Sequence, residues 1–157
     1  MVKSFYADLE AAKTAERLVL NVFSSLTSAY NFKDVSNDRA YWKKGDILAI
    51  DANGREIGIE VKQDSRIAQT NNVLCEEKVL FFDSGMAEGN MQSNYNIYCV
   101  VSPQARKIWC FDFNIMKQHY KIGRYIKIPH EEQITFAYLV SIAQFDELGA
   151  LIAIIDY

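Results

Sequence analysis

Cysteine and histidine are scarce in this chain of 157 residues, which holds three cysteines and two histidines. The cysteines are odd in number and widely spaced in apolar segments. We therefore expect reduced core residues of a cytoplasmic protein rather than a disulfide framework. The histidines lack metal-ligand spacing with the cysteines, so a zinc site has no support.

We also expect no membrane span and no targeting segment, and no repeat is visible in the sequence. The apolar C-terminus, residues 148–155, is too short to cross a bilayer, and no signal peptide is visible. We expect no membrane partner. Half of the residues are apolar and no linker or low-complexity segment interrupts them, so residues 1–157 are expected to form a single domain with its own core.

An excess of positive charge is absent, because 17 lysines and arginines face 20 aspartates and glutamates, giving a net charge of −3. This balance argues against a strong, non-specific nucleic-acid binder. It leaves room for an enzyme with a local basic groove, since carboxylates that bind metal also lower the net charge.

The most informative stretch, residues 44–64, has the pattern of a β-hairpin. Its arms, 47–50 and 57–61, are rich in β-branched residues, and Asp-Ala-Asn-Gly between them supplies turn chemistry. A three-residue loop, 52–54, with its glycine in the left-handed region keeps the isoleucines of the second arm together on the core face.

That loop also sets which polar residues meet. Counting back along the arms places Asp46 opposite Glu60, with Lys62 one pleat further along the same face. A two-residue Asn53-Gly54 turn would slip the register by one residue and separate the carboxylates. We expect the three-residue loop.

Two adjacent carboxylates repel each other and are costly to desolvate, and a bound divalent cation offsets both costs. Mg²⁺ takes one or two carboxylates together with waters and phosphate oxygens. The neighbouring lysine is suited to hold a water nucleophile or to offset charge on a phosphoryl group. The alternative is an ordinary solvated hairpin face, on which such residues are common.

At these residues the chain resembles the PD-(D/E)xK, or restriction-endonuclease-like, nuclease superfamily. Gly45-Asp46 stands at the P-D of its motif, with Gly in place of Pro, and Glu60-Val61-Lys62 stands at the (D/E)-x-K. The resemblance implies Asp46 and Glu60 as metal ligands, the Val61 carbonyl as a further ligand, and Lys62 at the nucleophilic water. It also implies Mg²⁺ or Mn²⁺ as cofactor and DNA as partner.

Glu16 is a candidate accessory ligand. It falls within the apolar stripe of an expected helix over residues 7–26, where a carboxylate needs a partner or a metal. The alternative places it at the edge of the stripe or pairs it with a lysine. Superfamily members carry an acidic residue in a similar A-E-R setting, here Ala15-Glu16-Arg17, and Holliday junction resolvases look similar there.

A second pattern follows the hairpin. Thr70, Asn72 and Glu76 resemble a T-G-N, apolar pair, glutamate pattern of phage-type members, with Asn71 replacing the glycine. Asparagine tolerates the left-handed region, so the replacement is mild. Asn72 is then suited to donate to a phosphate, and Glu76 to bind metal or orient Arg66. The alternative is a capped loop that leads into an ordinary strand.

Basic and aromatic residues gather just before the hairpin, as suits a phosphate backbone and an unstacked base. A solvated loop with Trp42 capping the core would look similar. A second basic group over residues 117–127 is a candidate for the other wall of a nucleic-acid groove, and its alternative is an exposed helix-turn-strand surface. The residues expected to contact substrate are Trp42, Lys43, Lys44, Arg66, Thr70 and Asn72.

Among the remaining segments, 95–102 and 107–111 are expected to be central strands, and 85–94 a mobile polar connection. Asp112 is expected to cap a short helix. Residues 136–145 are expected to form a late helix. The tail, 151–155, is expected as a late strand or a cover over the core, with sharing between the subunits of a homodimer as a further alternative.

The sequence therefore predicts an α/β fold, a restriction-endonuclease-like mixed sheet flanked by helices. The first helix is expected on one side and the late helix on the other. The predicted function is a divalent-metal-dependent nuclease that hydrolyses DNA phosphodiester bonds, with branched or recombination and repair intermediates as candidate substrates. The alternative is a catalytically inactive protein of the same fold that binds nucleic acid or serves in assembly.

Overall fold

The computed structural model describes residues 5–157. Its elements are, in chain order, α1 (Phe5–Leu26), β1 (Tyr30–Asp34), η1 (Arg39–Tyr41), β2 (Ile47–Asp51), β3 (Glu56–Gln63), α2 (Ile67–Thr70), β4 (Asn72–Phe81), β5 (Gly85–Glu88), η2 (Asn90–Gln92), β6 (Ile97–Ser102), β7 (Lys107–Asp112), α3 (Phe113–His119), η3 (Tyr120–Ile122), β8 (Arg124–Pro129), β9 (Gln133–Ser141), α4 (Ile142–Glu147) and β10 (Leu151–Asp156).

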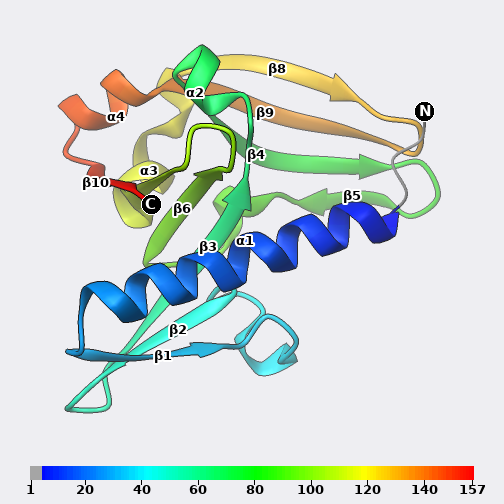
Figure 1. The fold of residues 1–157 in the computed structure, drawn as a ribbon. Coiled ribbons are helices and arrows are strands. Elements are labelled where there is room, and N and C mark those ends of the chain that lie inside the picture. Colours follow the sequence, from blue (N-terminus) through cyan, green and yellow to red (C-terminus); the bar gives the residue numbers. More distant parts are fainter. Residues whose placement is uncertain (1–4) are drawn as a thin grey trace.

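The larger of two sheets has six strands in the order β1-β2-β3-β6-β7-β10 (Figure 1). Only β3 and β6 pair in parallel, and the other neighbours are antiparallel. The sheet is therefore mixed, and the expected α/β fold class is confirmed. The two strands expected at central positions, β6 and β7, lie inside the sheet.

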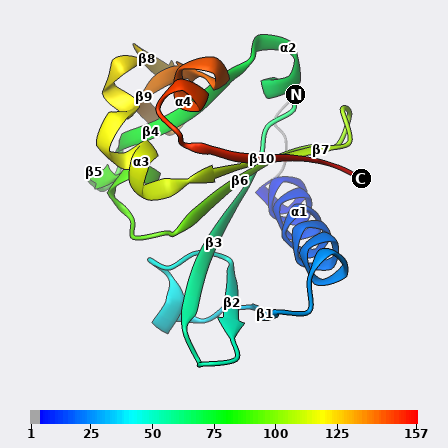
Figure 2. The ribbon, with the colours of Figure 1, turned by 90° about the vertical axis from the view of Figure 1, so that its left-hand side faces the viewer.

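Helix α1 covers one face of this sheet (Figure 2). Its buried stripe is centred on Ala15 and Val19, which pack against Ile47, Ile59 and other apolar residues of the sheet. The predicted stripe was wrong in part, because it included Ala12, which is exposed, and left out Ala15, which is buried. Apolar spacing of three and four residues allows several overlapping stripes, and only the sheet decides among them.

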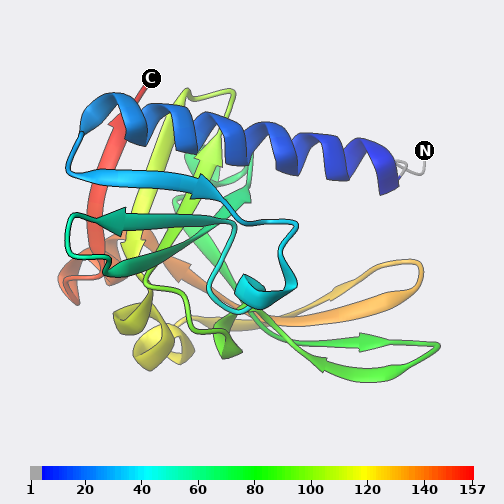
Figure 3. The ribbon, with the colours of Figure 1, turned by 90° about the horizontal axis from the view of Figure 1, so that it is seen from below.

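The opposite face is covered mainly by a second, antiparallel sheet in the order β5-β4-β9-β8, together with α3 and α4. Phe111 of the larger sheet packs there against Phe145 of α4, with ring centroids 5.7 Å apart. The hairpins β4–β5 and β8–β9 extend past the larger sheet on the side of the N-terminal half of α1 (Figure 3).

The predicted late helix over residues 136–145 is wrong. Most of that segment belongs to β9, which pairs with β4 on one side and β8 on the other. Its β-branched and aromatic residues favour a strand, and this outweighs the helical spacing of its apolar residues. The helix begins only after Ser141, whose side chain forms a capping box with Gln144. That S-x-x-Q pattern marks the true helix start.

The expected mobile connection over residues 85–94 is also wrong, since it forms β5, paired with β4, and η2. Asp112 caps α3 as predicted, accepting from the N–H of Ile115 at 3.2 Å. The tail is a late strand, β10, at one edge of the larger sheet. All three cysteines of the described chain are free and buried. No helix in residues 5–157 is long and apolar enough to cross a membrane.

Candidate metal centre

The loop between β2 and β3 has the three residues expected of it. The Asp51 N–H donates to the carbonyl oxygen of Arg55 at 3.0 Å, and the Gly54 N–H donates to that of Asp51 at 3.0 Å. Gly54 has a φ of 78°, in the left-handed region that glycine enters without a steric cost. The prediction of the turn is therefore confirmed.

The turn carries the register of the two arms. Ile47 lies opposite Ile59 in the ladder, so the preceding Asp46 comes opposite Glu60, and Lys62 follows on the same face. Ile59 faces α1 on the other side of the sheet. The three polar residues of the motif are thus brought together by local geometry alone.

Backbone contacts hold Asp46 in place. Its N–H donates to the carbonyl oxygen of Ile59 at 2.8 Å, and its Oδ2 accepts from the N–H of Val61 at 2.9 Å. Gly45, just before it, has a φ of 118°, and a Cβ there would lie 2.5 Å from the Ile59 carbonyl oxygen. Proline is locked near a φ of −65°. Glycine at this motif position therefore follows from the close approach of β3.

Glu60 is 6% exposed, less than an ordinary hairpin face would allow. Burial is the largest cause that raises the pKa of its carboxyl to about 8, and a hydrogen bond with Asp46 raises it further. The Lys62 ammonium and a hydrogen bond from Tyr95 act in the opposite direction. Without a cation, the carboxyl of Glu60 thus keeps its proton to near neutral pH, hydrogen-bonded to Asp46.

Glu16 reaches the same pair from α1. Burial and the negative charge of Asp46 raise the pKa of its carboxyl to about 7, and the two side chains form a hydrogen bond. The nearby Ser36 hydroxyl lowers this pKa and the charge of Asp34 raises it, while the Ser36 hydroxyl donates to Asp34 Oδ1 at 2.6 Å. The side chain therefore points towards Asp46, as the stripe argument expected.

Lys62 is the residue common to three neighbouring cavities. One, of about 480 Å³, also has Glu16, Asp46 and Glu60 in its wall, and we call it the acidic cavity. A second, of about 380 Å³, has Trp42 in its wall together with Asp46 and Glu60, and we call it the Trp42 cavity. The carboxylate pair lies between these two spaces and is reachable from both.

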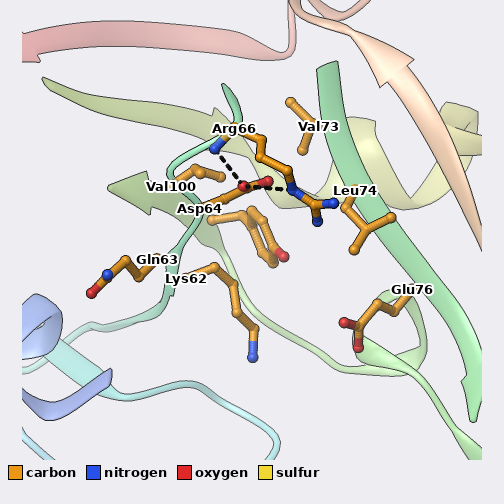
Figure 4. Close-up of a pocket in the computed structure, with 9 residues that line it drawn as sticks. Lys62, Gln63, Asp64, Arg66, Val73, Leu74, Glu76 and Val100 are labelled. Atoms are coloured by element: carbon orange, nitrogen blue, oxygen red, sulfur yellow. Dashed lines mark hydrogen bonds and ion pairs between the residues drawn. The ribbon is translucent and has the colours of Figure 1, made fainter. Parts of the chain in front are cut away.

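Glu76 and Arg66 line the third cavity, of about 140 Å³. Lys62 from β3 and Glu76 from β4 extend to the same side of it, while Arg66 turns to Asp64 (Figure 4). The Arg66 Nε lies 3.7 Å from the Asp64 Oδ1. Glu76 accepts from the side-chain amide of Asn90 at 3.4 Å. Arg66 thus pairs with Asp64 rather than Glu76, and Glu76 is set apart from the acidic cavity.

The other predicted substrate contacts are dispersed. The Nζ of Lys44 lies 3.3 Å from the Oε2 of Glu56, and Lys43 is exposed. Thr70 Oγ1 donates to the carbonyl oxygen of Arg66 and accepts from the N–H of Asn72, which makes these residues a cap on α2. The three cavities described above are lined by none of these four predicted contacts, Lys43, Lys44, Thr70 and Asn72. Trp42 is the exception.

Asn71, between Thr70 and Asn72, has a φ of 55° at the end of α2. Its left-handed conformation is the one that the replacement of glycine by asparagine allows. Two residues of the site were missed from sequence, Tyr95 and Ser36. Tyr95 comes just before β6, and only the parallel pairing of β6 with β3 brings it to Glu60.

The carboxylates are suited to Mg²⁺ or Mn²⁺, which need few protein ligands, and not to an ion that protein side chains alone must surround. Within residues 5–157, no three His, Cys, Asp or Glu side chains are arranged as a metal cluster. Mg²⁺ does not need one, since one or two carboxylates hold it and waters or phosphate oxygens complete its shell. Asp46 and Glu60 share a hydrogen bond and open onto two cavities, which meets that requirement.

The metal-free protein should lose stability as the pH rises from about 5 to about 8. The pKa of the Glu60 carboxyl is about 8 in the folded protein and near 4.5 in the unfolded chain. Its contribution to stability is fully present below pH 4.5, where it is protonated in both states, and is lost as the pH rises to about 8. At about 1.4 kcal/mol per pKa unit, we expect a loss on the order of 3 kcal/mol. Urea unfolding in a chelator would measure it.

Glu60→Gln is the matched control, because it removes the titrating group and keeps the shape. The pH dependence of the unfolding free energy should flatten in this variant. Added Mg²⁺ should restore the stability of the wild-type protein at the upper end of the pH range. A wild-type unfolding free energy that rises over the same range would contradict a raised pKa at the buried Glu60.

No family model and no curated protein matches the sequence. Among solved structures, the fold is similar to that of a bacterial homing endonuclease, I-Ssp6803I, with a TM-score of 0.46 and 10% sequence identity. The similarity covers 79% of this chain and 74% of that one.

Proposed function

We propose that the protein is a divalent-metal-dependent nuclease that hydrolyses DNA phosphodiester bonds. The observation that carries this proposal is the convergence of Asp46, Glu60 and Lys62 on one strand face, between two cavities. An ordinary hairpin face would expose these side chains to solvent. Here a glutamate is buried against an aspartate, an arrangement that a bound cation would relieve.

Each residue has a role in this proposal. Asp46 and Glu60 would hold the cation, with the Val61 carbonyl as a further ligand and Glu16 as an auxiliary carboxylate, while Glu76, predicted as a second one, lies apart from the acidic cavity. When bound, Mg²⁺ or Mn²⁺ would neutralise the charge that builds on the scissile phosphate. The Lys62 ammonium would donate to the attacking water and hold it in line with the phosphorus. The water oxygen would bond to phosphorus as the bond from phosphorus to the leaving sugar oxygen breaks; the attacking water would release a proton to solvent, and the leaving oxygen would take one up from solvent.

The second candidate is a catalytically inactive protein of this fold that binds nucleic acid or serves in assembly. The net charge of −3 favours it, since a nuclease usually holds its substrate with an excess of basic residues. A resolvase of branched DNA, in contrast, would need two such centres facing one junction and hence a homodimer, which sedimentation would detect.

The test is cleavage of a panel of single-stranded, duplex and four-way-junction DNA with Mg²⁺ or Mn²⁺. We expect at least one of these to be cut, and a chelator to abolish the cutting. Lys62→Ala protein, purified in the same way, controls for a contaminating nuclease. Folded wild-type protein with no cation binding by calorimetry and no cleavage across the panel would favour the inactive alternative.

A further inference from the structure

The Trp42 cavity is the part of the centre that the chemistry of the carboxylates does not account for. Asp46, Glu60 and Lys62 line it together with Asn37, Arg39 and Trp42, which precede the hairpin in the chain. Its volume of about 380 Å³ is more than a cation and its waters need. The cavity therefore has room for a larger group next to the site of cleavage.

Trp42 is 78% exposed, more than any other large apolar side chain described. It does not cap the core, and the second tryptophan, Trp109, is 5% exposed within the core between the two sheets. Leaving an indole in water forfeits the burial that usually stabilises it. An aromatic ring of this kind, beside a polar cavity, is suited to stack on a planar ligand.

The backbone around Trp42 is held firmly although its side chain is not covered. Asp38 caps η1 by accepting from the N–H of Ala40 at 3.0 Å. The N–H of Trp42 donates to the carbonyl oxygen of Arg39 at 3.4 Å, and that of Lys44 to Tyr41 at 2.8 Å. The indole is thus presented from an ordered turn, so stacking on it would order little additional backbone.

The net charge of the protein also favours a ligand that is bound by stacking. With 17 basic against 20 acidic residues, the protein gains little affinity from phosphates alone. Stacking of a base on an aromatic ring supplies affinity that does not depend on net charge, and it works for every base. Bases inside a continuous duplex are already stacked on each other, so only an unpaired base is available for this contact.

We propose that the Trp42 cavity binds an unpaired base, stacked on Trp42, of the strand whose phosphate lies at Asp46, Glu60 and Lys62. This inference rests on the proposed function and names its substrate class. The substrate is DNA with an unpaired nucleotide beside the scissile phosphate, as in a single strand, a bulge or a branch, and not a continuous duplex.

Intrinsic fluorescence tests this directly, because Trp109 is buried and Trp42 is the exposed one of the two tryptophans. Wild-type protein in a chelator, which prevents cleavage, is titrated with a single-stranded oligonucleotide, its perfect duplex, and the duplex with a one-base bulge. We expect the single strand and the bulge to quench the fluorescence, and to bind roughly 5- to 150-fold more tightly than the duplex.

Trp42→Ala should remove this preference, by lowering affinity for the single strand roughly 5- to 150-fold and leaving affinity for the duplex unchanged. Anisotropy of a labelled oligonucleotide measures both. Trp42→Phe should keep most of the preference. Phe82→Ala, which truncates an aromatic residue 59% exposed just beyond the end of β4, is the matched control and should change nothing.

Equal quenching by duplex and single strand, or an unchanged preference in Trp42→Ala, would overturn the inference. Cleavage with Mg²⁺ is measured separately on the same three substrates. Cutting of the perfect duplex as fast as the bulge would overturn the inference and leave the nuclease in place. Selective quenching without cutting of any substrate would support the cavity as a base-binding site and overturn the nuclease.

Discussion

Lys62→Ala should lower the rate of DNA cleavage roughly 100- to 10,000-fold while leaving affinity for Mg²⁺ nearly unchanged. The side chain lines the acidic cavity and the Trp42 cavity and is proposed to act on the attacking water, not on the cation. Single-turnover cleavage and calorimetric titration with Mg²⁺ would separate the two effects. Loss of Mg²⁺ affinity together with activity would place Lys62 in a structural role instead.

Two further variants serve as comparisons for Lys62→Ala. Asp46→Asn should weaken Mg²⁺ binding by more than about tenfold, because even changes behind a metal ligand commonly have that effect. Its folded stability without metal should hold or rise, since the negative charge that helps to raise the pKa of Glu60 is removed while an amide oxygen can still accept from Val61. Lys44→Ala removes a lysine of the same hairpin that pairs with Glu56, and cleavage should persist.

Gly45→Ala should destabilise the protein by about 3 kcal/mol or more. The added Cβ would lie 2.5 Å from the carbonyl oxygen of Ile59, and the φ of 118° strains any residue with a side chain. Relief would require β3 to move away from Asp46, so Mg²⁺ affinity should fall as well. The midpoint of urea unfolding, at an unchanged slope, is the measurement.

Gly54→Ala is the control for backbone strain alone. Gly54 also has a positive φ, of 78°, but nothing lies within 4 Å of the Cβ it would gain. We expect a loss of only about 1 to 2 kcal/mol there. Equal losses at both positions would show that the approach of Ile59 contributes nothing.

The parts of the site that could be predicted from sequence are those that depend on local rules. The pairing of Asp46 with Glu60 follows from turn chemistry and strand alternation within one hairpin. The direction of Glu16 follows from helical spacing, although the stripe itself was misplaced. In both cases the residues that decide the geometry are close neighbours along the chain.

Tyr95 could not be found in this way, because its approach to Glu60 depends on the parallel pairing of β6 with β3. Nothing local specifies that pairing. Segment 136–145 failed for a related reason, since its apolar spacing suits a helix while its pairing partners β4 and β8 lie elsewhere in the chain. Burial of Glu60 was missed because it depends on residues from several elements that converge.

The three-residue turn has a consequence for how this centre tolerates change over generations. Successive residues of a strand point to opposite faces, so deleting one residue within 47–50 would carry the aspartate to the side covered by α1. Replacing Ala52 or Asn53 at the same loop length would leave the ladder as it is, because Gly54 keeps the turn and Asp51 and Arg55 still close it. Variants of the hairpin are thus free to differ at these two loop positions, whereas a loop or an arm shortened by one residue would separate Asp46 from Glu60.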